Sequence, residues 1–317
     1  MEKEEIILTP ESVQAEIKRT RHKKEVPLYV LLSILGLLTA GIITLLKSES
    51  TFVEIVRALI EESGIGTEGV DIKALTMLLT VIAVMLSGIG MVIFLLVSAF
   101  VALYRYYAVE LAYGIRVSEN NYPEIYEKVK EYTYLLGLKK EPEVFVRQEN
   151  GAVNAFTCWI PNRAFIQLNA EIVDLAYLEN KDWDTVYFVM AHEFGHYYLH
   201  HVQIGYTIWP VLVTLIPVLG PNFLLPLLSR SREYSADRVA QALTNGVAQE
   251  NCMKLLSAGR HGYKYVDTES YLKEISRNPG RTAALARWII NMLASHPIAP
   301  FRTAAILDPE KKSGRLL

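Results

Sequence analysis

The chain has 317 residues, 51% of them hydrophobic, and its mean hydropathy of +0.20 is high for a soluble enzyme and indicates membrane-spanning segments. Lys and Arg (32) nearly balance Asp and Glu (34), with no basic face, which argues against a nucleic-acid partner. Two cysteines, Cys158 and Cys252, are too few for a disulfide framework and lack metal-site spacing, so free thiols in a reducing compartment are expected.

Residues 1–25 are highly charged and end in a basic cluster directly before residues 26–46, an apolar run long enough to cross a bilayer. A cleaved signal peptide is the competing interpretation. The run is long, begins late and precedes no convincing small-residue cleavage site, so a retained membrane anchor is predicted.

Residues 47–73 form a polar, mainly acidic loop, and residues 74–104 form a second apolar run, enough for one tilted helix. Because the basic cluster precedes the first span, the positive-inside bias places the N-terminus in the cytoplasm. Two crossings return the chain near Arg105, so residues 105–317 are predicted to be a cytoplasmic domain.

The pattern from residue 105 onward predicts an α+β domain that is mainly helical. Residues 122–136 fit a helix, with Pro123 near its start and Gly137 at its end. Three short apolar or β-branched runs then predict a small sheet, with turns at Asn150-Gly151 and Pro161-Asn162. These runs are 143–147, 153–158 and 164–168. An edge strand here either holds a peptide substrate or is plain scaffolding.

The sheet is followed by a helix that contains His192-Glu193-Phe194-Gly195-His196, with Asp182 as its expected N-cap. Helical spacing places His192 and His196 one turn apart on one face, so both imidazoles can bind one metal ion, and Glu193 lies beside them as a general base. Two surface histidines beside a glutamate are the competing interpretation. His200 lies about 12 Å from His192 along the axis, so it and His201 are excluded as ligands and expected at the surface.

Residues 203–229 are apolar for roughly the length of one span, yet four prolines interrupt them. One crossing here would separate the histidines from the rest of the domain, and a metal site cannot draw ligands across a bilayer. We therefore predict an apolar hairpin or re-entrant segment of two helical halves that break near Gly220-Pro221. A buried core segment is the alternative.

A second helix is expected over residues 230–246, where Glu233 and Asp237 share one face. Because hydrolytic zinc takes three protein ligands and His₂Glu is one of the known sets, Glu233 is predicted as the third ligand. Asp237, one turn on, is predicted to accept the N–H of a ligand histidine. Without the histidine motif, the two carboxylates would be an ordinary solvated pair.

The ordered array of these motifs resembles the HtpX and type I CAAX prenyl endopeptidase family, a group of gluzincin membrane metalloproteases. The matching residues are His192 to His196, then Arg230, Glu233, Tyr234, Ala236 and Asp237, then Ser295-His296-Pro297 with Arg302. Asn154-Ala155-Phe156 also matches the family strand that precedes the active-site helix, and residues 142–146 match the strand before it. The resemblance covers roughly residues 105–305.

This resemblance implies one Zn²⁺ per chain, a cytoplasm-facing site and hydrolysis of peptide bonds. It implies that His296 and Arg302 face the reacting carbonyl, where N–H donors stabilise developing negative charge. A structural cap around Pro297 is the alternative for that element. Asn154, Ala155 and Phe156 are expected to hold the substrate backbone.

The chain departs from the family in two places. Members usually carry two full transmembrane helices between the histidines and the glutamate, whereas this chain has only the short, proline-interrupted run. The family strand often continues into glycine where this chain has Cys158-Trp159.

The expected function is zinc-dependent cleavage of membrane or misfolded proteins at the cytoplasmic face of a membrane, as in bacterial quality control. The alternatives are CAAX-type processing of lipidated proteins, a site-2-type intramembrane protease that would use Asp308 as a ligand, and a non-catalytic membrane scaffold. The expected partners are protein or peptide substrates and the lipid bilayer.

Overall fold

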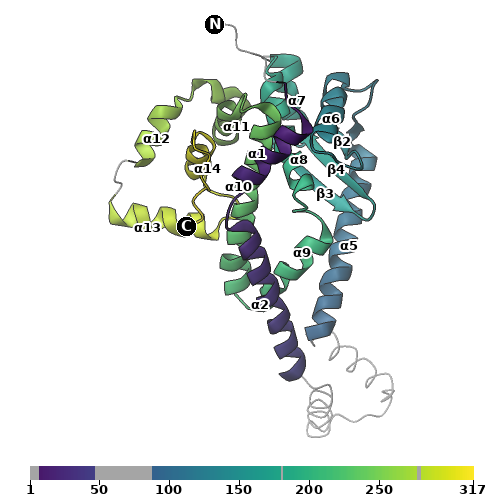
Figure 1. Ribbon diagram of the computed structural model, residues 1–317, viewed down its shortest axis with the longest axis vertical. Helices are drawn as coiled ribbons and strands as arrows, with labels where there is room; N and C mark the ends of the chain where they lie inside the picture. Colours follow the sequence, from purple (N-terminus) through teal and green to yellow (C-terminus); the bar gives the residue numbers. More distant parts are fainter. Residues whose placement is uncertain (1–6, 47–87, 180, 277–279) are drawn as a thin grey trace.

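The computed structural model describes residues 7–46, 88–179, 181–276 and 280–317. The predicted loop 47–73 and the first part of the predicted span 74–104 lie outside the described residues. In Figure 1, two long helices, α2 and α5, leave the same end of a body that holds the sheet and most other helices. The predicted fold class, α+β and mainly helical, is confirmed.

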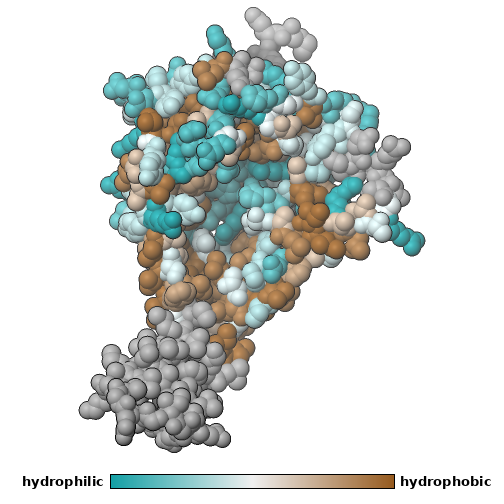
Figure 2. Space-filling model, turned by 180° about the vertical axis from the view of Figure 1, so that it is seen from behind, coloured by the Kyte–Doolittle hydropathy of each residue, from teal (hydrophilic) through white to brown (hydrophobic). Residues whose placement is uncertain are grey.

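The two long helices, α2 (Glu25–Leu46) and α5 (Gly88–Tyr113), are apolar around their whole circumference. Their segments Glu25–Ile43 and Val92–Tyr113 are long and apolar enough to cross a membrane, and only 17% and 0% of the 18-residue apolar window within each segment is buried in the protein. Figure 2 shows hydrophobic surface gathering toward the end from which they project. Apolar surface of this extent is typical of contact with lipid.

Helix α5 continues past the expected end at residue 104 because its last turns dock on the sheet. Glu110 is fully buried and its Oε1 accepts a hydrogen bond from Nη1 of Arg147 at 2.6 Å. Tyr107 packs its ring against Phe145 and Phe165. These contacts hold the helix to the domain beyond the apolar run.

A short helix, α1 (Pro10–Thr20), lies within the charged N-terminal stretch and was not expected from the sequence. Thr9 caps it by accepting from the Ser12 backbone N–H, while the Ser12 hydroxyl and the Thr9 backbone pair in return, and Pro10 opens the first turn. Val13 and Ile17 are buried in the main core. The N-terminal stretch is therefore part of the domain, at the domain end of α2.

The sheet has four strands within the described residues, in the order β1-β2-β4-β3. Strands β2 and β4 are parallel, and the other two pairs are antiparallel. The bounds are β1 Ile115–Arg116, β2 Glu143–Arg147, β3 Ala155–Ile160 and β4 Arg163–Asn169. The predicted runs coincide with β2, β3 and β4 to within two residues, whereas β1 was missed because two residues carry no periodic pattern. Among the described strands β3 pairs only with β4, which leaves its other edge free.

The two faces of the sheet pack against different layers, as the alternation of strand side chains requires. Val144, Ile166 and Leu168 belong to the main core with α6 (Pro123–Leu135) and α8 (Trp183–Tyr198). Phe145, Cys158 and Phe165 point to the opposite face and pack against Leu103 and Tyr107 of α5. The sheet is thus held between the apolar helix α5 and the helix that carries the histidine motif (Figure 1).

The apolar stretch 203–229 folds back on itself beside α2. Helix α9 (Ile204–Val211) runs into a 3₁₀ turn, Leu212–Leu215, and the chain reverses where Val218 has a φ of +62°. A π-helical turn, Gly220–Leu224, then leads into α10 (Leu225–Thr244). Helix α10 starts five residues earlier than expected, because its apolar first turns pack Leu228 against Leu32 and Val213. Entry of this stretch into lipid stays a prediction.

The remaining helices complete the domain, and two of them contact α10. Arg230 of α10 is fully buried and donates to the carbonyl oxygens of Leu316, Met292 and Ala294. The helices are α7 Ala170–Asp174, α11 Gln249–Gly262, α12 Thr268–Ser276, α13 Arg281–Leu293 and α14 Ala299–Ile306. The residues around Leu316 are therefore part of the structure that fixes α10.

Candidate active site

The site is built on the crossing of α8 and α10. Asp182 caps α8 by accepting from the Thr185 backbone N–H at 3.2 Å, as expected. The two helices meet at Gly195, where an added Cβ would lie 3.0 Å from the Cα and carbonyl oxygen of Ala236 and from Cβ of Val239. A glycine is therefore needed for this close approach, which brings the histidine face of α8 against the carboxylate face of α10.

Three donor atoms from these helices converge at the crossing. His192 Nε2 lies 3.1 Å from His196 Nε2 and 3.5 Å from Glu233 Oε2, and His196 Nε2 lies 3.4 Å from Glu233 Oε1. Tetrahedral zinc with bonds of about 2.0–2.2 Å places its donors about 3.3 Å apart. The donor set and its spacing fit zinc, and these are the three residues predicted as ligands.

Asp237 and Arg302 orient the residues of this cluster through hydrogen bonds and ion pairs. Asp237 Oδ1 accepts from His192 Nδ1 at 2.9 Å, which assigns the Nε2 lone pair of His192 to the metal site, where Arg302 Nη2 also lies 3.3 Å from this nitrogen. Arg302 donates from Nε and Nη2 to both oxygens of Asp237 at 2.8 and 2.7 Å, and its Nη1 lies 3.4 Å from Glu233. Asp237 therefore lies where the sequence placed it, and much of the Arg302 guanidinium is engaged by Asp237.

The electrostatics of the cluster favour a bound cation. Burial and the Arg302 charge act to lower the pKa of His192, but hydrogen bonds to Asp237 and Glu233 outweigh them and raise it to about 9. Burial favours a neutral Glu233, yet hydrogen bonds from His192 and His196 hold the pKa of this carboxyl well below its usual range. Burial also opposes ionisation of Asp237, and the Arg302 charge prevails and lowers its pKa to about 2. Two buried carboxylates thus stabilise positive charge between the imidazoles.

His201 contradicts the expectation that it lies at the surface. Helix α8 ends at Tyr198, and the left-handed backbone at His200 (φ +62°) turns the chain so that His201 points back into the protein, 6% exposed. Its Nδ1 lies 3.0 Å from His196 Nδ1, and its Nε2 lies 3.0 Å from Oε1 of the buried Glu25. His200 is exposed, as expected, and neither residue joins the metal cluster.

The His201 contacts define the proton arrangement on His196. Burial lowers the pKa of His201 to about 3, so its ring is neutral at neutral pH. With the Nε2 proton donated to Glu25, Nδ1 of His201 accepts from Nδ1–H of His196. The Nε2 lone pair of His196 then faces the metal site. The spacing of residues along the chain does not predict the contact between His201 and Glu25, because Glu25 lies at the start of α2 and reaches His201 only in the tertiary fold.

Glu193 faces the sheet beside the metal cluster. Its Oε2 lies 2.7 Å from the Thr157 hydroxyl, which is also 2.9 Å from the Glu193 carbonyl oxygen. Thr157 belongs to β3, so the strand orients the carboxylate expected to act as general base. The sequence analysis did not single out Thr157, although its position one residue after the predicted substrate-binding run placed it on the same strand.

A cavity of about 290 Å³ opens over the cluster. Its walls include the three candidate ligands and Glu193, the strand residues Asn154, Ala155 and Phe156, and His296 and Arg302 from the C-terminal region. The structure thus brings the predicted metal, catalytic and substrate residues to one place. The His296 side chain is 65% exposed, with its Nε2 3.5 Å from Glu233 Oε1, so its ring stands at the cavity mouth.

Other candidate residues lie outside this chemistry. Asp308 accepts from the backbone N–H of Glu310 at 2.9 Å in a surface turn and is not part of the metal cluster. Cys158 and Cys252 are buried free thiols, and burial raises their pKa to about 11 and about 12. Both thiols are therefore protonated at neutral pH, and both are free, as expected from the sequence.

A family model described as Peptidase family M48 matches residues 119–310. The match covers more than half of the chain and runs from just before α6 to the turn after α14. Comparison with curated proteins and with solved structures found no match.

Proposed function

This chain belongs to peptidase family M48 and is a zinc metalloendopeptidase, and from that premise we propose that it cleaves membrane or misfolded proteins at the cytoplasmic face of a membrane. The observation that carries the proposal is the convergence of His192, His196 and Glu233 at donor separations of 3.1–3.5 Å, beside the free edge of β3. His192, His196 and Glu233 would hold one zinc ion. When bound, the metal supplies an electrophile that activates water and polarises the peptide carbonyl.

The side chains of this protein supply the proton transfers. Glu193, oriented by Thr157, takes a proton from the attacking water and delivers it to the leaving amine. His296 stands at the cavity mouth, where an N–H donor stabilises the negative charge that develops on the carbonyl oxygen. Arg302 fixes Asp237 and adds positive charge beside Glu233.

The substrate backbone is expected to pair with the free edge of β3. A peptide added there as a strand gains main-chain hydrogen bonds from Asn154 to Phe156 without any demand on its sequence. Its scissile bond would then pass over Glu193 and the metal cluster. Such binding suits an endopeptidase that acts on unfolded segments.

Two observations support a site on the cytoplasmic side of a membrane. Helix α1 packs on α10, so the N-terminal stretch and the domain lie at the same end of α2. The basic cluster Lys18 to Lys24 lies at that end, and the positive-inside bias assigns such clusters to the cytoplasm.

The test is the variant Glu193→Gln in the full chain. The amide cannot take a proton from water, so proteolysis is expected to fall by at least about 100-fold while zinc content is unchanged. Membranes from cells that make either protein are compared by proteomics for fragments that depend on the glutamate. Wild-type activity in the variant, or a zinc-loaded wild type that yields no fragments, contradicts the proposal.

A further inference from the structure

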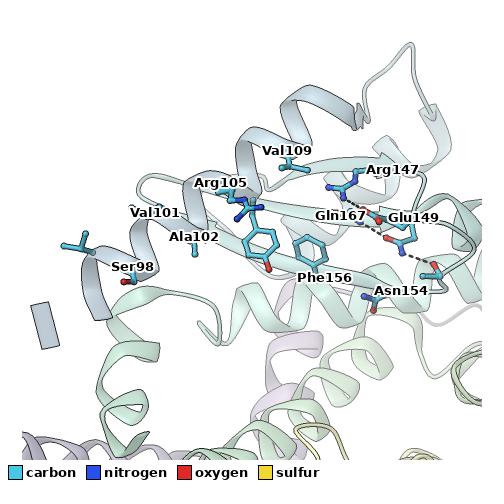
Figure 3. Close-up of a pocket in the computed structure, with 14 residues that line it drawn as sticks. Ser98, Val101, Ala102, Arg105, Val109, Arg147, Glu149, Asn154, Phe156 and Gln167 are labelled. Carbon is cyan, nitrogen blue, oxygen red and sulfur yellow. Dashed lines mark hydrogen bonds and ion pairs between the residues drawn. The ribbon is translucent and has the colours of Figure 1, made fainter. Parts of the chain in front are cut away.

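A second and larger cavity, of about 780 Å³, lies on the opposite side of β3 from the metal cluster. One wall is the face of α5 that carries Val97, Val101 and Ala102, and the other is the sheet face that carries Asn154, Phe156 and Gln167. Figure 3 shows Val101 and Ala102 on the helix and Phe156 and Gln167 on the strands facing this space. One wall therefore belongs to a candidate membrane span and the other to the strand beside the active site.

The two cavities meet at the edge of β3. Asn154 and Phe156 line both, whereas Ala155 and Thr157 line only the cavity over the cluster, where Thr157 contacts Glu193. This division follows from the two-residue repeat of a strand. A peptide paired with the free edge has the same repeat, so its side chains point alternately toward the metal cluster and toward the cavity beside α5.

The walls define what this cavity accepts. Val97, Val101, Ala102 and Phe156 supply apolar surface along its length. Charged groups also line it, namely Arg105 and the ion-paired Arg147 and Glu149. At the sheet end, Gln167 is 2% exposed and donates to Asn169 at 2.6 Å, but its side-chain oxygen has no hydrogen-bond partner. This oxygen is itself buried, so a bound side chain meets the other residues of the walls.

We propose that this cavity is a side-chain subsite of the protease, which takes a large apolar or aromatic side chain from a substrate segment that leaves the membrane beside α5. The proposal rests on the proposed function and specifies its substrate class: extended segments next to a membrane-spanning helix, with large apolar residues at alternate positions. Because α5 forms one wall of the cavity, substrate segments are selected at the edge of the apolar layer of the membrane. Soluble unfolded chains that lack such residues are then poorer substrates.

The test is to fill the cavity from the helix side. Ala102→Trp places an indole into the space between α5 and Phe156, and Ala108→Trp is the matched control because Ala108 is an exposed α5 residue that does not line the cavity. The purified full-chain zinc enzyme is given peptide series in which each residue near the cleaved bond is varied among Gly, Ala, Leu and Phe. Ala102→Leu provides a smaller filling in case the indole prevents folding.

Wild type and Ala108→Trp are expected to cleave the Leu and Phe peptides about 10-fold faster or more at alternate positions, the scale of discrimination that an apolar pocket achieves. Ala102→Trp is expected to lose this preference and Ala102→Leu to reduce it, where the preference is the rate on the Leu or Phe peptide divided by the rate of the same protein on the Gly peptide. Identical preferences in all four proteins overturn the subsite and leave the proteolytic function intact. An equal loss on every peptide, restored by added phospholipid, assigns the cavity to lipid and also overturns it. A zinc-loaded wild type that cleaves no peptide counts instead against the proposed function.

Discussion

The imidazole of His196 has a different partner at each nitrogen, and this asymmetry determines which lone pair is available to a metal. Nε2 faces His192 and Glu233, and Nδ1 contacts His201, which in turn contacts Glu25. His201 and Glu25 are both buried, and together they link the first turn of α2 to the candidate ligand His196. His201, for which the sequence predicted no role in the site, thereby positions the candidate ligand His196.

Removal of this support is expected to weaken metal binding. His201→Ala leaves Nδ1 of His196 without its partner, and loss of a partner to a ligand histidine costs roughly 10–100-fold in metal affinity. Zinc affinity is measured by competition with a chromogenic chelator, with His200→Ala as control because the neighbouring His200 is exposed. Equal affinities in the two variants would show that the His201 contact does not position the ligand.

The separate roles of Glu233 and Asp308 distinguish this site from that of a site-2-type intramembrane protease, which would use Asp308 as a metal ligand. Glu233→Ala removes one of the three converging donors and is expected to abolish stoichiometric zinc binding, because two histidines alone hold zinc weakly. Asp308→Ala removes only a turn contact and is expected to leave zinc content unchanged. Metal content after dialysis measures both, and zinc loss in the Asp308 variant alone would favour the site-2-type arrangement.

Among the elements, the contact of α8 with α10 controls whether the donors meet. Gly195→Ala adds a methyl group 3.0 Å from the backbone of Ala236, which cannot rotate away. Overpacking costs about 1–3 kcal/mol, whereas the gain in helix propensity is about 1 kcal/mol, so net destabilisation and weaker zinc binding are expected. Thermal unfolding and zinc competition measure the two effects.

Gly205 provides the control for this substitution, since a Cβ there meets nothing within 4 Å. Gly205→Ala is expected to leave the unfolding temperature unchanged or slightly raised. If both variants were equally stable, the helix crossing would have room to spare at Gly195, and close packing would not be the reason for this glycine.

Local patterns predicted the elements of the site better than the contacts between them. The histidine motif and the Asp182 cap depend on neighbours within a turn, and the structure has both as expected. The end of α10 is equally local and lies within two residues of the expected end at 246. The burial of His201 depends on a chain reversal at His200, and its partner Glu25 is remote in sequence. The early start of α10 depends on packing against α2. Pairing across such distances leaves no periodic signal in a single sequence.

At the scale of the whole molecule, the packing of α1 on the domain predicts topology. Ile7 and Tyr265 are 84% and 90% exposed and lie before α2 and after α11, and both native cysteines are buried. Ile7→Cys and Tyr265→Cys are therefore expected to react with a membrane-impermeant maleimide from the same side. Inverted and right-side-out vesicles distinguish the sides, and both thiols should react in inverted vesicles. Labelling of the two positions from opposite sides would contradict the packing of α1.

The anchoring of α10 by the residues around Leu316 has a consequence during protein synthesis. Both histidines leave the ribosome about 120 residues before Leu316, whose carbonyl accepts from the buried Arg230. At about 5–20 residues per second, a growing chain carries its histidine motif for roughly 6–24 s before α10 is secured. We therefore expect zinc uptake, and with it peptide hydrolysis, to begin only after this contact has formed. Zinc uptake by ribosome-bound chains of increasing length should rise stepwise once that residue emerges.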